Sequence, residues 1–244
     1  MFSLVKKEIN SFLNSLIGYI VIVVFLLTIS LFLWIFKDSE FNILANGYAA
    51  LDPLFVITPW VYMFLIPAVT MRLFSEEKKS GTLELLVTRP LTELQIILAK
   101  YTAGVILVVF SLLPTLVYYV TVYQLGITPG NLDVGATRGS YLGLLLLGAG
   151  FVSIGVFASA ITDNQVIAFI IALFLCLFFY IGFEKISDLF LNGSISHIVF
   201  NIGIYAHYIS MSRGVIDTRD VVYYLSLIAL FIILTRTVLE SRKW

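Results

Sequence analysis

Six mostly apolar runs recur along this chain, and they constrain its fold more than any other feature of the sequence. An α-helix rises 1.5 Å per residue, so about 20 apolar residues match the ~30 Å hydrocarbon core of a bilayer. Each run is expected to be helical, because an open strand in lipid leaves its backbone polar groups unpaired. The predicted spans are 17–36, 54–74, 102–123, 141–161, 166–183 and 221–239.

The composition agrees with an all-α integral membrane protein. Of 244 residues, 60% are apolar and only 12% are charged, whereas soluble domains are about half apolar and a quarter charged. The formal net charge is zero, and no region is basic enough to follow phosphates, which excludes a nucleic-acid partner. The single cysteine, Cys176, excludes a disulfide within the chain.

Lysine and arginine residues predict the orientation. Six spans place both termini on one side, and that side carries ten of the 15 basic residues, against five on the other. Cytoplasmic segments carry the excess of lysine and arginine, so both termini and the 75–101 connection are predicted to be cytoplasmic. The bilayer itself is therefore a partner of this multi-pass protein.

The N-terminal segment, residues 1–16, has apolar residues at three- and four-residue spacing. Lys6, Lys7 and Glu8 lie on other faces. This pattern predicts an amphipathic helix at the cytoplasmic interface. The alternative is an ordinary basic anchor before the first span.

The connection between spans two and three is predicted to form two short helices. Gly81 allows a sharp turn, and Ser80 or Thr82 can cap residues 82–88. Pro90 ends that helix, and Thr92 with Gln95 has capping-box spacing. So short a helix must pack on something. The residues alone leave two alternatives, which are a docking surface for another protein and a connector that folds back on the bundle.

The connections on the other side are expected to hold turns and, within 184–220, short helices near the membrane surface or packed on the bundle. His197 and His207 lie in that segment without cysteine or carboxylate residues at ligand spacing, so a polar contact is predicted instead of a metal site. Asp163, with Thr162, is predicted to cap the fifth span.

The spans themselves argue against two classes of protein. Serines in the spans lack a span histidine or aspartate, which disfavours an intramembrane enzyme. No predicted span has an ionisable residue near its centre, which disfavours a secondary transporter. The fourth span is rich in small residues, with Ala149/Ser153 and Gly155/Ser159 at the spacing of close helix contacts. Packing within the monomer is the favoured interpretation, and a face toward a second half of a larger membrane unit is the alternative.

One stretch resembles a known family. Residues 67–90 read PAVTMRLFSEEKKSGTLELLVTRP, which is similar to the P-x-x-T-M-R, E-E and G-T-x-E-L-L signature of ABC-2-type transporter permeases. Val5-Lys-Lys-Glu-Ile9 resembles the N-terminal interfacial helix of that family, and Ser212–Asp220 resembles the motif before its last span. The nearest resemblance is to gliding-motility-associated (Gld-type) permease subunits. Permeases of copper-site assembly clusters share several of these motifs.

The resemblance implies roles for individual residues. The segment around Gly81–Thr88 would be a cytoplasmic coupling helix seated on an ATPase. The implied coupling residues are Glu76, Glu77, Gly81, Thr82, Glu84, Leu85, Leu86, Thr88, Arg89 and Pro90. The implied interfacial-helix residues are Lys6, Lys7 and Glu8, and those of the motif before span six are Arg213, Gly214, Asp217, Arg219 and Asp220.

The resemblance also implies partners. A cytoplasmic ABC ATPase subunit would bind ATP and Mg²⁺, and a second permease half, identical or different, would complete the membrane unit. The sequence itself contains no G-x-x-x-x-G-K-[ST] run, so no catalytic, cofactor or metal site is expected in this chain. Two alternatives stay open, which are a non-transporting anchor or regulator of envelope machinery and a secondary transporter.

Overall fold

The computed structural model describes residues 1–45, 47, 49–82, 91–126, 131–190 and 193–241, and these residues form helices without strands. The first half contains α1 (Phe2–Leu13), α2 (Leu16–Ser30), the π-helix η1 (Leu31–Ile35), α3 (Asp52–Thr70), α4 (Arg72–Lys79), α6 (Glu93–Leu112), the 3-10 turn η2 (Leu113–Thr115) and α7 (Leu116–Leu125). The second half contains α8 (Val134–Ile161), α9 (Gln165–Leu177), the π-helix η3 (Phe178–Gly182), α10 (Phe183–Ser187), α11 (Gly193–Ile202), α12 (Ile204–Ser212) and α13 (Thr218–Glu240).

Within the described residues, six helical segments, some made of two or three consecutive helices, are long and apolar enough to cross a membrane, which confirms the predicted fold class. They are Leu16–Ile35, Asp52–Lys79, Glu93–Leu125, Val134–Ile161, Gln165–Ser187 and Thr218–Glu240. Several extend beyond the predicted apolar runs. Helical hydrogen bonding depends on the backbone, so a helix continues into water past its lipid-facing part until a cap or turn ends it.

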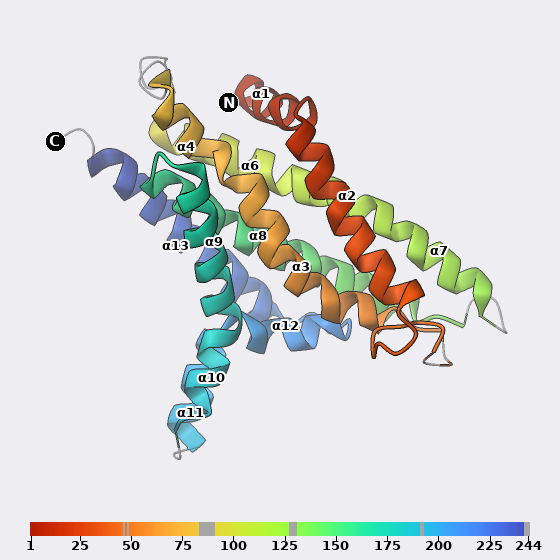
Figure 1. Ribbon diagram of the computed structural model, residues 1–244. Helices are drawn as coiled ribbons and strands as arrows, with labels where there is room; N and C mark the ends of the chain where they lie inside the picture. The colour runs from red at the N-terminus through yellow and green to blue at the C-terminus, as the bar shows by residue number, and fades with distance from the viewer. Residues whose placement is uncertain (46, 48, 83–90, 127–130, 191–192, 242–244) are drawn as a thin grey trace.

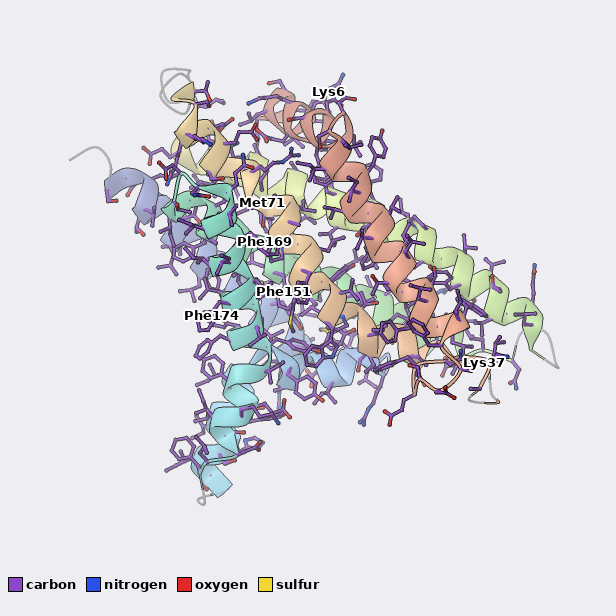
Figure 2. The ribbon with its side chains drawn as sticks, viewed as in Figure 1. Lys6, Lys37, Met71, Phe151, Phe169 and Phe174 are labelled. Carbon is purple, nitrogen blue, oxygen red and sulfur yellow. The ribbon has the colours of Figure 1, made fainter. Side chains whose placement is uncertain are left out.

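Both chain termini lie at the same end of the bundle, together with α1 and α4 (Figure 1). We call this the terminal end. The opposite end, which we call the far end, holds α12, the last turn of α7 and the loop after η1 (Figure 1). Lys6 and Lys37 mark the two ends (Figure 2). An even number of crossings requires this arrangement.

The fourth span, α8, is the centre of the bundle and packs on α3, α4, α6, α9, α12 and α13. Its glycines permit these contacts. A Cβ atom on Gly143 would lie 2.6 Å from Met211 Cβ, one on Gly148 would lie 2.8 Å from a Val108 methyl, and one on Gly155 would lie 2.0 Å from Thr70 Oγ1. The small residues of α8 therefore serve packing within the monomer, as favoured from the sequence.

The segment 184–220 forms short helices, as expected. Helices α10 and α11 pack on each other and project from the bundle (Figure 1). Helix α12 lies across the far end, where Tyr208 of α12 donates a 2.6 Å hydrogen bond to the carbonyl of Phe55 in α3.

Local signals are borne out in part. The Thr92–Gln95 capping box is present at the start of α6, and Pro114 interrupts the third span at η2. The prediction that Asp163 caps the fifth span is wrong. Asn164 is the N-cap, because its extended backbone brings its Oδ1 within 2.9 Å of the Val166 amide, while Thr162 accepts from the Asn164 amide.

Substitution of Gly155 with alanine should destabilise the bundle, because the added methyl group would overlap Thr70 of α3. We expect a loss of about 1–3 kcal/mol, typical of overpacking, measured as a lower thermal unfolding midpoint in detergent. Gly193→Ala is the control, since nothing lies within 4 Å of its Cβ position. Equal midpoints for the two variants would contradict the packing role of Gly155.

Candidate coupling surface at the terminal end

Three helices from distant parts of the sequence meet at the terminal end, and local sequence signals place each of them. Helix α1 is amphipathic and buries Leu4, Val5 and Phe12, packing mainly on α6. The capping box fixes the start of α6, with hydrogen bonds of 3.3 Å from the Gln95 amide to Thr92 Oγ1 and 3.1 Å in return. Helix α4 continues α3 after an interruption at Met71.

The interruption at Met71 is stabilised from α8. The backbone amides of Phe74 and Ser75, at the start of α4, donate to Ser159 Oγ at 2.8 and 3.2 Å. The Ser159 hydroxyl lies 3.3 Å from the Met71 carbonyl, which it can donate to, and the Lys78 ammonium donates to the Ala160 carbonyl. A serine side chain thus satisfies amides that a helix start leaves unpaired, and α4 is fixed to the end of α8.

Four charged side chains join α1, α4 and α6, and we call them the charge cluster: Lys7, Glu8, Glu77 and Lys100. Lys100 Nζ lies 3.0 Å from Glu8 Oε1 and 2.8 Å from Glu77 Oε2, while Lys7 Nζ lies 2.8 Å from Glu77 Oε1. The Lys100 side chain is 0% exposed, and those of Glu8 and Glu77 are 11% and 9% exposed. The two positive and two negative charges balance.

Lys100 is the centre of the charge cluster. A lysine ammonium has three donors. It bonds Glu8 and the Leu73 carbonyl, and it forms an ion pair with Glu77 Oε2, an atom that makes no hydrogen bond. The ammonium also lies 5.1 Å from the centre of the Phe74 ring, a cation–π distance. Removing such an ion from water costs several kcal/mol, and these partners offset that cost.

Lys7, the outer lysine of the cluster, has a side chain that is 57% exposed. Burial disfavours the charged form of Lys7, but the hydrogen bond and the negative charge of Glu77, with those of Glu8, raise the pKa of Lys7 above its ordinary value. The ion pair of Lys7 with Glu77 therefore joins α1 to α4 at the surface. In the interior, Lys100 of α6 pairs with both of these helices.

The predicted coupling residues divide into exposed and buried groups. Glu76, Gly81 and Thr82 are exposed, whereas Glu77 is buried in the charge cluster. Gly81 has φ +69°, the left-handed conformation that favours glycine. Ser80 ends α4, and its hydroxyl donates to the Glu76 carbonyl. Glu84, Leu85, Leu86, Thr88, Arg89 and Pro90, and with them the predicted helix 82–88, lie outside the described residues beyond Thr82.

The interfacial-helix residues lie at the same end. Lys6 is exposed, while Lys7 and Glu8 belong to the charge cluster. Leu4 and Val5 pack inside the protein, so part of the apolar face of α1 covers the bundle.

The motif before span six lies at the far end, separate from the coupling residues. Gly214 has φ +83°, and a Cβ there would lie 2.2 Å from Ala136 Cα at the start of α8. Asp217 caps α13 by accepting from the Arg219 amide, which is the main cause of its lowered pKa. Arg213 and Arg219 are exposed. The described geometry of this motif is that of a turn packed on α8.

The two histidines make polar contacts, as predicted. His207 Nδ1 lies 2.8 Å from Asp220 Oδ1, and its Nε2 lies 2.9 Å from the Asn201 carbonyl. His197 Nδ1 lies 2.9 Å from Asn201 Nδ2. Within the part of the chain that the structure describes, no group of three or more His, Cys, Asp or Glu side chains could hold a metal ion.

Sequence reasoning counted Lys100 as one more basic residue of the connection and missed its burial. The available signal was its setting in IILAKYTAGVILVV, where a single charge interrupts an apolar run. An ionisable residue in such a run requires a partner. The sequence does not show which of the 15 acidic residues that partner is.

The arrangement of six apolar spans, in which α3, α6, α9 and α13 pack on the glycine-rich central helix α8 and charged helix ends gather at one end, defines a polytopic α-helical membrane protein. Comparison with protein-family models matches residues 2–242 to the ABC-2 family transporter protein model, and the chain belongs to that family. No curated protein matches it at a significant level.

Family membership makes the chain a multi-pass membrane permease of an ABC transporter, a component distinct from the ATPase. It confirms the resemblance at the level of the family. The gliding-motility subfamily stays a prediction.

Replacing Lys100 with methionine should strongly destabilise the protein, because Glu8 and Glu77 would keep buried charges without the ammonium. Breaking a buried pair costs about 3–5 kcal/mol, measured as a lower unfolding midpoint. Adding Glu8→Gln and Glu77→Gln should recover most of the loss. Lys79→Met, at an exposed lysine of α4, is the control. A Lys100→Met protein as stable as this control would refute the structural role of the cluster.

The stabilisation from Lys7 should disappear at high pH. Its folded pKa is raised, so the contribution is complete below the unfolded value of about 10.4 and is lost as the pH rises through the folded value. Wild type should exceed Lys7→Gln in unfolding midpoint at about pH 8, and the difference should shrink by about pH 11. A difference that persists at the higher pH, or that appears equally with Lys79→Gln, would argue against this ion pair.

Proposed function

We propose that this chain is a permease subunit that couples ATP hydrolysis by a separate cytoplasmic ABC ATPase to movement of its membrane helices. The observation that carries the proposal is the fixation of α4. This helix leads directly into the predicted coupling segment, and it is joined to α8 by Ser159 and to α1 and α6 by the charge cluster. A displacement of the segment after Thr82 would therefore move several helices together.

The exposed part of this surface fits a protein partner. Glu76, Gly81 and Thr82 are exposed where the chain leaves α4, and Glu84 and Arg89 follow in the sequence. The ATPase would contact these residues, while Glu77 would act from inside by keeping α4 on α1 and α6. Packed side chains and hydrogen bonds can carry coupling between a docking surface and the spans, and α4 with α8 supplies such a path.

The remaining parts of the proposal follow from this role. ATP and Mg²⁺ would bind to the partner ATPase, and a second permease half, identical or different, would complete the unit. The excess of basic residues at the terminal end supports a cytoplasmic position for that end, and we propose that the spans lie in the inner membrane of a bacterium. The resemblance to Gld-type permeases favours a role in gliding motility, through export or mechanical work.

A non-transporting anchor or regulator of envelope machinery is the second candidate. The apolar interior of the monomer, in which Leu144, Leu147, Phe151 and Ile154 are fully buried, is compatible with it. A tight interface between two permease halves would favour it over transport. A secondary transporter is disfavoured, because the buried charges of the cluster lie at the terminal end of the helices and not at the midplane.

The proposal is tested by mild-detergent pull-down of the tagged protein, with bound chains identified by mass spectrometry. Wild type should retain a P-loop ATPase, and Glu84→Arg should lose it, because the docking surface would carry a reversed charge. Glu40→Arg is the matched control, since Glu40 is exposed at the far end. If no ATPase is recovered with wild type even after cross-linking, the coupling proposal fails. If an ATPase is recovered and the interface between the two permease halves is tight and filled with lipid, the anchor is favoured.

A further inference from the structure

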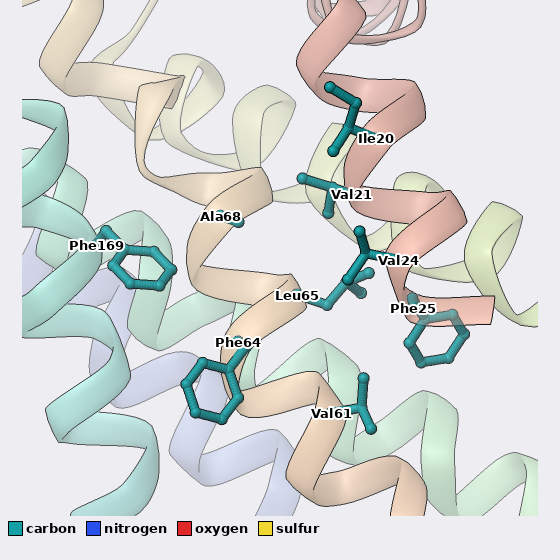
Figure 3. A pocket seen from close by; sticks show the side chains of 9 residues that line it. All are labelled: Ile20, Val21, Val24, Phe25, Val61, Phe64, Leu65, Ala68 and Phe169. Carbon is teal, nitrogen blue, oxygen red and sulfur yellow. The ribbon is translucent and has the colours of Figure 1, made fainter. Parts of the chain in front are cut away.

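An apolar groove runs between the first two spans. It has a volume of about 230 Å³ and is lined by Ile20, Val24, Phe64, Leu65, Ala68 and Phe169, among others (Figure 3). Ile20, Val24 and Phe64 are 50%, 54% and 60% exposed, so the groove opens onto the lipid-facing surface. Helices α2 and α3 form its walls, and Phe169 of α9 closes one side (Figure 3).

The groove occupies the half of the membrane at the terminal end. Its α2 residues lie between Ile20 and Phe25 of a helix that starts at Leu16, which is about 6–14 Å from that start at 1.5 Å per residue. On α3 the groove runs from Val61 to Ala68, the side nearer α4. Half of the hydrocarbon core is about 15 Å, so the groove matches the depth of an acyl chain in one leaflet.

Arg72 lies beyond the end of this groove that is nearer α4. It follows Ala68 by about one helical turn, and its Nη2 donates a 3.1 Å hydrogen bond to Ser15 Oγ, at the N-cap of α2. Its guanidinium carbon lies 5.7 Å from the centre of the Phe12 ring. Among the described residues, Arg72 contacts this hydroxyl and this ring but forms no ion pair with a carboxylate.

Two carboxylates lie near Arg72, and neither neutralises it. Glu8 and Glu76 line a small polar pocket of about 30 Å³ together with Arg72. Glu8 is already paired with Lys7 and Lys100, and Glu76 is exposed to solvent. A guanidinium has five N–H donors in a geometry that suits a phosphate, and one of them is used here.

We propose that the α2–α3 groove holds one acyl chain of an anionic phospholipid whose phosphate pairs with Arg72. The apolar walls supply the contact with the chain, and the arginine supplies the charge at headgroup depth. A zwitterionic lipid has the same acyl chain and phosphate, but its own cation competes with Arg72, so the anionic lipid is preferred. This site does not depend on the proposed coupling to an ATPase.

The test uses the full-length protein reconstituted with equal amounts of phosphatidylglycerol and phosphatidylcholine that carry the same acyl chains. Lipids retained after mild delipidation are counted by native mass spectrometry. Wild type should retain phosphatidylglycerol about fivefold more than phosphatidylcholine, the size expected for one basic side chain at the surface. Arg72→Gln should remove this preference, and Arg72→Lys should keep part of it.

Two further variants separate the groove from general surface charge. Val24→Trp, at an exposed wall position, should lower retention of both lipids by filling the groove. Arg236→Gln changes an exposed arginine of α13 that pairs with Glu240, and it should leave the preference unchanged.

Equal retention of the two lipids by wild type, or an unchanged preference in Arg72→Gln, would overturn the proposal. Equal losses in Arg72→Gln and Arg236→Gln would also overturn it, because they would indicate unspecific attraction to a basic surface. Unfolding midpoints of each variant show that the protein remains folded.

Discussion

The buried ammonium of Lys100 is the interaction on which the terminal end of this protein depends. The Lys100 side chain is 0% exposed, so opposite charges and hydrogen-bond acceptors of the protein must replace its contacts with water. Those groups are Glu8 of α1, and Glu77 and the Leu73 carbonyl of α4. The three helices α1, α4 and α6 must therefore meet in one arrangement, since a displacement of any of them would leave a buried charge without its partner.

Helix α4 is also fixed to the bundle by contacts with α8. The helix is interrupted at Met71, and the backbone amides of Phe74 and Ser75 that follow donate hydrogen bonds to Ser159 Oγ. Close packing of Gly155 on Thr70 lies one turn away on α8. Polar and steric contacts thus converge on the junction of α3, α4 and α8. Motion imposed on the connection after Thr82 has a short packed route to the centre of the bundle, which is the physical basis of the proposed coupling.

The first span buries few of its residues against the bundle. Helix α2 buries only Gly18, Phe25 and Ile29, and the groove beside it opens to lipid. Arg72 connects this region to the junction, because it lies next to Met71 and bonds Ser15 before α2. A bound anionic lipid would consequently lie next to α4, the helix that leads into the proposed coupling segment. The bilayer composition and the ATPase could then act on neighbouring parts of one structure.

Much of the fold follows from local sequence alone. Six apolar runs determine six membrane helices, because lipid allows few other backbone structures. Thr92 and Gln95 determine the start of α6, and Gly81 provides the turn after α4, because caps and left-handed turns depend on neighbouring residues. The helix predicted over 82–88 rests on the same kind of signal, and residues 83–90 lie outside the described residues.

Other features were decided only by the tertiary structure. Asn164 instead of Asp163 caps α9, because the backbone at that corner places one side chain and not its neighbour beside the free amide. Glu8 and Lys100 are far apart in the sequence and become partners through the packing of α1 on α6. Ion-pair partners depend on which helices pack together and in which rotation. Local sequence determines the helices but not their mutual packing, so the charge cluster and the lipid groove appear only in the folded protein.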